Sequence, residues 1–158
     1  MQTIYIETSV ISYFIADISN NITVSAHQLA TKRMWDYLAS YDVYISDTVA
    51  EEASRGNAEQ AKKRMLAMSD FTVLPINDDV KLLAKLFLSK QVIPEKCPED
   101  ALHIAVAAIN NIEFIVTWNF KHINNPFTYK RIEKIIQDAG YNSPVMCSPE
   151  EFIGENDE

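Results

Sequence analysis

The feature that most constrains the fold is a regular alternation of short apolar segments with longer segments of helical periodicity. Two of the apolar segments, "IYI" (4–6) and "FIV" (114–116), show no alternation of polar and apolar residues. Such a strand is buried on both faces, as is typical of a parallel sheet covered by helices on each side. The pattern therefore predicts an α/β/α sandwich around a central parallel sheet.

The expected elements follow one another along the chain as strand and helix in turn. Strands are expected at residues 2–6, 41–46, 71–76, 114–118 and 144–147, the last at an edge of the sheet. Helices are expected at residues 8–14, 23–39, 47–56, 57–68, 78–89, 98–109 and 127–139. We expect one domain over residues 1–148, followed by an acidic C-terminal tail at 149–158.

Composition narrows the classes of function. A chain of 158 residues, 47% hydrophobic and 23% charged, fits a single globular domain. It has no apolar stretch long enough to span a membrane and no signal-peptide pattern, so a cytoplasmic protein is expected. The net charge of −8 argues against binding nucleic acid by broad phosphate neutralisation. Cys97 and Cys147 lack C-x-x-C spacing, so we expect two buried thiols and neither a disulfide nor a zinc site.

Polar side chains stand where the two most apolar strands end. Glu7 follows the first strand, and Thr117 and Asn119 follow the fourth. In open α/β sheets, ligands bind outside the carboxyl ends of the strands. Glu52, early in the helix after the second strand, and Asp100, in the first turn of an otherwise apolar helix, can face the same crevice.

Each acid also has an ordinary structural explanation. Glu52 fits a solvated helix residue, and Asp100 fits a favourable charge at a helix N-terminus. Glu7 is harder to explain, because a carboxylate beside a buried strand is costly unless it is paired or holds a metal. Three converging carboxylates with no Lys or Arg adjacent in sequence favour a hard divalent cation, Mg²⁺ or Mn²⁺.

Four segments together resemble the ordered motifs of the PIN domain family. They are "YIETSV", "TVAEEASRG", "EDALHIAVAA" and "IVTWNFKHI", and the resemblance extends from Thr3 to about Ser148. It is strongest to the VapC-like toxin ribonucleases of toxin-antitoxin pairs. It implies an α/β/α nuclease in which acidic residues hold Mg²⁺ or Mn²⁺ and RNA is cut.

By position, Glu7, Glu52, Asp100 and Asn119 match the family's four site residues. The resemblance assigns the metal to Glu7, Asp100 and Glu52, and catalysis to these three with Asn119. Ser9 matches the small hydroxyl residue that supports the first carboxylate.

The chain departs from the family pattern at two of these positions. Glu7 stands where Asp is usual, and Asn119 where many members have Asp, which favours one metal ion over two. Thr117 is assigned a supporting role. Lys121 and His122 are assigned contacts with RNA phosphates, whereas His103 is expected to be a hydrogen-bonded residue in or near the site.

Other α/β functions are tested by their missing motifs. The three glycines cannot form a dinucleotide fingerprint or a phosphate-binding P-loop, and "FIVTWNF" lacks the residues of a phosphoacceptor domain. The alternative that stays open is a PIN-fold module that binds RNA or protein without cutting. The resemblance also implies an antitoxin protein as partner and leaves a homodimer open.

Overall fold

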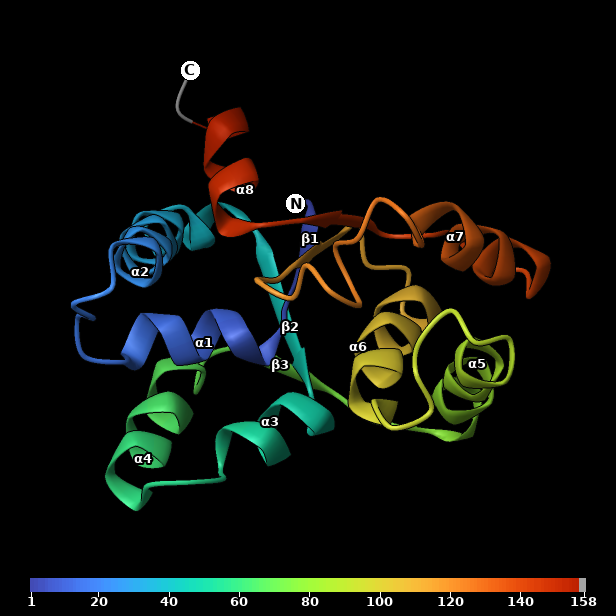
Figure 1. Ribbon diagram of the computed structural model, residues 1–158, viewed down its shortest axis with the longest axis horizontal. Helices are drawn as coiled ribbons and strands as arrows, with labels where there is room; N and C mark the ends of the chain where they lie inside the picture. Colours follow the sequence, from blue (N-terminus) through green and yellow to red (C-terminus); the bar gives the residue numbers. More distant parts are fainter. Residues whose placement is uncertain (157–158) are drawn as a thin grey trace.

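The protein folds around one parallel sheet with helices on both of its faces. The computed structural model describes residues 1–156. The sheet has five strands in the order β3-β2-β1-β4-β5, and every neighbouring pair is parallel (Figure 1). The strands are β1 (Thr3–Ile6), β2 (Asp42–Ser46), β3 (Thr72–Leu74), β4 (Phe114–Val116) and β5 (Val145–Cys147).

The helices form two layers, which confirms the predicted α/β/α sandwich. In Figure 1, α1, α2 and α4 lie on the left of the sheet and α5 and α6 on the right. The helices are α1 (Thr8–Ile15), α2 (Ile22–Trp35), α3 (Asp47–Ala53), α4 (Ala58–Ala67), α5 (Asp78–Ser89), α6 (Pro98–Ile109), α7 (Tyr129–Asp138) and α8 (Pro149–Asn156), with a 3₁₀ turn at Leu38–Ser40.

The central strand and its covering helix explain why the core is well defined. Ile4, Tyr5 and Ile6 of β1 are fully buried, as the unbroken apolar run predicts. Helix α6 begins at Pro98, whose fixed backbone suits a first turn, and is buried from Ala101 to Ala108 except at Leu102. The acidic residues Glu99 and Asp100 lie in the first turn of this otherwise largely buried helix.

The strand order fixes where a ligand site should lie. The chain builds β1, β2 and β3 outward in one direction and then crosses to β4 and β5 on the other side of β1. The strand order reverses between β1 and β4, and this switch point is where open α/β sheets bind ligands. The backbone N–H of Glu7 donates to the Val116 carbonyl across this gap, at 3.1 Å.

Some predicted boundaries were wrong. The helix expected at 23–39 ends at Trp35 and is followed by the 3₁₀ turn, and the strand expected at 114–118 ends at Val116. The expectation of two buried thiols holds for Cys147 but not for Cys97, which is half-buried.

The expected acidic tail is helical over most of its length. Helix α8 packs against α2, and Phe152 and Ile153 are buried. Residues 157–158 of the predicted tail lie outside the described residues, and the domain division at 148 stays a prediction. Over residues 1–156, no helix combines the length and apolar character needed to cross a membrane.

Candidate active site

Glu7 is held firmly at the end of the central strand. The residue is 5% exposed, and its side chain caps helix α1, where Oε2 accepts from the Ser9 backbone N–H at 3.1 Å. The hydroxyls of Ser9 and Thr117 both donate to Oε1, the latter at 2.6 Å. Hydrogen bonds of this kind offset the cost of burying a carboxylate.

The loop after β4 is tied to the same carboxylate. Thr117 is fully buried, and its Oγ1 also accepts from the Asn119 backbone N–H at 2.9 Å. The Trp118 backbone N–H donates to the Ser9 hydroxyl at 3.0 Å. The polar groups that follow β1 and β4 therefore form one network at the switch point of the sheet.

Glu52 approaches Glu7 from helix α3 and is held by two donors. Its Oε1 accepts from the Thr8 hydroxyl at 2.8 Å and from His103 Nε2 at 2.6 Å. The same His103 nitrogen lies 3.9 Å from Glu7 Oε2. Ligand atoms of Glu7, Glu52 and His103 all lie within 4.8 Å of one another, which makes them a group able to hold a metal ion.

His103 is oriented from behind by a buried hydroxyl pair. Its Nδ1 is hydrogen-bonded to the Tyr5 hydroxyl at 2.6 Å, and that hydroxyl lies 2.7 Å from Ser46 Oγ. Because Nε2 faces a carboxylate, it carries a proton and donates. Burial raises the pKa of Tyr5 well above its ordinary value, an effect that the charges of Glu7 and Glu52 reinforce, so the phenol stays protonated.

The charges in this site perturb one another. Burial alone lowers the pKa of His103, but the hydrogen bond with Glu52 and the charges of Glu7, Glu52 and Asp100 outweigh it, and the pKa is raised. Burial alone raises the pKa of Glu52, yet the hydrogen bond and charge of His103 and the Thr8 hydroxyl lower it to about 2. The hydrogen bond between His103 and Glu52 therefore favours the ionised form of Glu52 and the protonated form of His103.

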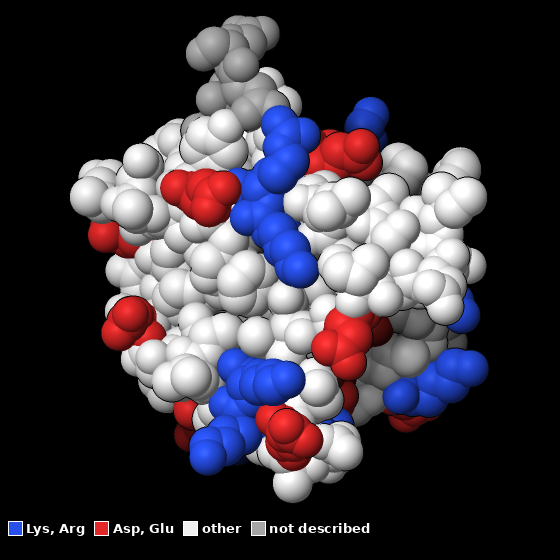
Figure 2. All heavy atoms as spheres, turned by 90° about the vertical axis from the view of Figure 1, so that its left-hand side faces the viewer, with Lys and Arg blue, Asp and Glu red and all other residues white. Residues whose placement is uncertain are grey.

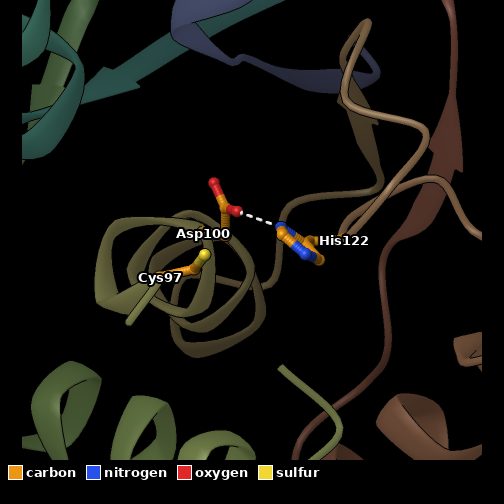
Figure 3. Close-up of side chains that lie close together, drawn as sticks. All are labelled: Cys97, Asp100 and His122. Carbon is orange, nitrogen blue, oxygen red and sulfur yellow. Dashed lines mark hydrogen bonds and ion pairs between the residues drawn. The ribbon is translucent and has the colours of Figure 1, made fainter. Parts of the chain in front are cut away.

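Asp100 belongs to a neighbouring group of ligating side chains. Its Oδ2 is 2.7 Å from His122 Nδ1, and Cys97 lies beside them (Figure 3). The His122 backbone N–H donates to Asn119 Oδ1 at 2.9 Å. A continuous chain of hydrogen bonds therefore runs from Asp100 through His122, Asn119 and Thr117 to Glu7.

The predicted site residues thus fall into two adjoining groups. Glu7 and Glu52 share His103, while Asp100 is connected to Glu7 through Asn119 and the residues between them. Ser9 and Thr117 contact Glu7 directly. His122 contacts Asp100, and Lys121 is exposed.

The sequence reasoning missed two charged residues at the rim. Glu99 lies beside Glu52, and its hydrogen bond with Glu52, together with burial, raises the pKa of Glu99. Arg55 contacts Glu99 at 3.0 Å and Glu51 at 3.4 Å. The signal for Glu99 was its position directly before Asp100 in the first turn of α6.

The chain is similar to a known protein family. The family model of the PIN domain matches residues 4–127. No curated protein sequence matches significantly.

Three solved structures from bacteria share the fold. A VapBC2 structure from Rickettsia felis, bound to a DNA fragment from the promoter, is 16% identical with a TM-score of 0.60, covering 93% of this chain and 98% of its own. VapC20 of Mycobacterium tuberculosis, a toxin that cleaves the sarcin-ricin loop, is 19% identical with a TM-score of 0.57. The match covers 87% of this chain and 95% of VapC20. VapBC-1 from nontypeable Haemophilus influenzae is 16% identical with a TM-score of 0.55, covering 94% and 98%.

Proposed function

The chain belongs to the PIN domain family, and from that membership we propose that it is a metal-dependent endoribonuclease acting in the cytoplasm. The observation that carries the proposal is the placement of Glu7 and Glu52. Their carboxylates meet beside His103, within 4.8 Å, at the switch point of a parallel sheet. Hydrolysis of RNA phosphodiester bonds is the reaction that this arrangement suits best.

The donor set fits a hard divalent cation. Glu7, Glu52 and Asp100 would hold Mg²⁺ or Mn²⁺, because both ions prefer oxygen ligands. Glu7 is buried with its oxygens already oriented by hydroxyl and amide donors, as expected of a ligand prepared for an ion. When bound, the ion supplies an activated water and neutralises charge that develops on the phosphate.

The residues around the carboxylates position the reacting groups. Ser9 and Thr117 fix the rotamer of Glu7, and Thr8 and His103 fix that of Glu52. The Asn119 backbone N–H donates to Thr117 Oγ1, and Asn119 Oδ1 accepts from the His122 backbone N–H. These bonds orient the side-chain amide of Asn119 to position the attacking water. Lys121, exposed on the same loop, is suited to contact an RNA phosphate.

The electrostatics favour a localised substrate contact. The net charge is −8, and Figure 2 shows Lys and Arg on the side of α1, α2 and α4 in separate groups interspersed with acids. On that face RNA would therefore find no continuous basic surface, and with a net charge of −8 it would be held mainly at the ion and by a few cations.

The structural neighbours suggest the biological setting. VapBC2 and VapBC-1 carry the names of toxin-antitoxin pairs, and VapC20 is described as a toxin that cleaves the sarcin-ricin loop. We therefore propose that this chain is the toxin of such a pair. Its partner would be a small antitoxin protein that places a cationic side chain in the acidic crevice.

One observation favours a second candidate, a module that binds RNA or protein without cutting it. His103 Nε2 lies 2.6 Å from Glu52 and 3.9 Å from Glu7, in the space between two carboxylates that an ion would share. A permanent imidazolium there would take over the charge neutralisation that an ion provides. The two candidates differ in whether adding metal produces cleavage.

Cleavage of RNA by the purified protein separates them. We expect cleavage of a mixed pool of single-stranded and structured RNA with Mg²⁺ or Mn²⁺, and loss of cleavage in excess chelator. Glu7→Gln and Asp100→Asn should each abolish it. Glu59→Gln and Asp79→Asn are matched controls, because both acids are exposed in the first turns of other helices. Cleavage that persists in excess chelator, or in both site variants, would overturn the proposal.

A further inference from the structure

The start of α6 and the loop after β4 bring together a second set of ligating atoms, different in chemistry from the carboxylate group. The Cys97 thiol, a carboxylate oxygen of Asp100 and a ring nitrogen of His122 all lie within 4.8 Å of one another (Figure 3). We propose that these side chains form a binding site for a borderline-soft divalent cation such as Zn²⁺.

The donor types decide which ion the site selects. Thiolate, imidazole and carboxylate are the ligands of Zn²⁺, whereas Mg²⁺ and Mn²⁺ favour oxygen donors. Glu7 and Glu52 offer oxygens with one imidazole, but Cys97 adds sulfur to its own group. The two groups therefore differ in ion preference, although Asp100 adjoins both.

The backbone holds the three side chains on one surface. Cys97 and Asp100 are three residues apart at the start of α6, so they face the same side of the helix. Cys97 occupies the N-cap position, yet its side chain makes no capping hydrogen bond. The thiol is therefore not used to stabilise the helix end.

His122 completes the group from a fixed position. Its backbone N–H is held by Asn119 Oδ1 at 2.9 Å, and its Nδ1 lies 2.7 Å from Asp100 Oδ2. In a tetrahedral zinc site with bonds of about 2.0–2.3 Å, ligand atoms lie roughly 3.3–3.8 Å apart. The three atoms already lie within 4.8 Å of one another, and binding an ion requires Asp100 Oδ2 and His122 Nδ1 to move apart from their hydrogen-bond distance of 2.7 Å.

The three side chains of this site are partly exposed to solvent. The side chains of Asp100 and His122 are 20% and 14% exposed, and Cys97 is half-buried. Three protein ligands with access to solvent leave the fourth position of a tetrahedral ion to water. An ion can therefore enter without unfolding any element.

Cobalt(II) provides a direct test, because it replaces Zn²⁺ and gives a thiolate-to-metal charge-transfer band in the near ultraviolet. We expect this band when the reduced full-length protein is titrated with Co²⁺, and its bleaching by added Zn²⁺. Cys97→Ser should abolish the band. Serine is a preferred N-cap residue, so this variant should keep the helix and the melting temperature.

Two further features make the assignment specific. Cys147 remains in Cys97→Ser, so a band that survives would assign the sulfur to Cys147 and overturn the proposal. His122→Ala should weaken Co²⁺ binding at least about tenfold, the scale seen even for residues that only support a ligand. Absence of the band in the unaltered protein, or unchanged affinity in His122→Ala, would likewise overturn it. No RNA enters this experiment, so its failure is distinguishable from failure of the nuclease proposal.

Discussion

Replacing Thr117 with valine removes the hydroxyl that joins the two central strands at the candidate site. The two side chains have nearly the same shape, so the fully buried position loses polar contacts but little volume. Two hydrogen bonds disappear, the donation to Glu7 Oε1 at 2.6 Å and the acceptance from the Asn119 N–H at 2.9 Å.

The expected loss of stability follows from these two bonds. A hydrogen bond to a charged group contributes about 1.5–3 kcal/mol, and a neutral one about 0.5–1.5 kcal/mol. Thr117→Val should therefore lower the free energy of unfolding by about 2–4.5 kcal/mol. For a domain of this size, that corresponds to a fall in melting temperature of about 5–15 °C.

Urea denaturation and thermal melting without metal measure this change. Thr72→Val is the matched control, because Thr72 is exposed in β3, and its effect should stay within about 0.5 kcal/mol. Mn²⁺ affinity should also fall, by about 10- to 100-fold, since Thr117 orients a proposed ligand. If the free energy of unfolding of Thr117→Val stays within about 0.5 kcal/mol of that of the unaltered chain, the two hydrogen bonds of Thr117 do not stabilise the fold as proposed.

Two further predictions concern charge in the site. Asn119→Asp should raise Mn²⁺ affinity and lower the metal-free melting temperature, because a fourth carboxylate repels the others until an ion binds. Asn119→Ala should weaken Mn²⁺ binding while leaving the fold intact. Equal Mn²⁺ affinities of the unaltered chain and both variants in calorimetric titration would contradict this prediction. The stability difference between the unaltered chain and Glu52→Gln, measured by urea denaturation across pH, should reach at most about 3 kcal/mol. This stability difference should be largest between pH 4.5 and pH 6.5, the ordinary pKa values of Glu and His. It should decline as pH falls from 4.5 toward the lowered pKa of Glu52 at about 2. It should also decline as pH rises through the raised pKa of His103. A difference independent of pH would contradict the pairing.

The layers of the fold could be predicted because burial leaves a direct mark on the sequence. The runs at 4–6 and 114–116 lack polar alternation, and both are strands buried in the middle of the sheet. Element ends were less predictable. Trp118, an aromatic residue two positions beyond β4, extended the predicted strand, but its indole N–H donates to Thr31 Oγ1 at 2.8 Å, and the backbone has already left the sheet.

The site could be predicted only in part, because hydrogen-bond partners far apart in sequence leave no local pattern. Glu7 and Glu52 were indicated by their positions after strands, which the strand order brings together. Tyr5 looked like one more apolar residue of a buried strand, yet its hydroxyl orients His103. Likewise, nothing in the spacing of Cys97 and His122 indicates that they meet, since the contact depends on how the loop after β4 crosses the start of α6.

We propose that three carboxylates from different parts of the chain, those of Glu7, Glu52 and Asp100, share one ion. Calorimetric titration with Mn²⁺ tests it most directly, on the unaltered chain and on Glu7→Gln, Glu52→Gln and Asp100→Asn. We expect binding by the unaltered chain and at least about tenfold weaker binding by each variant. Asp100→Asn is decisive, because Asp100 is hydrogen-bonded to His122 and belongs to a different group of ligating atoms from Glu7 and Glu52. Unchanged Mn²⁺ affinity in that variant would contradict a shared site.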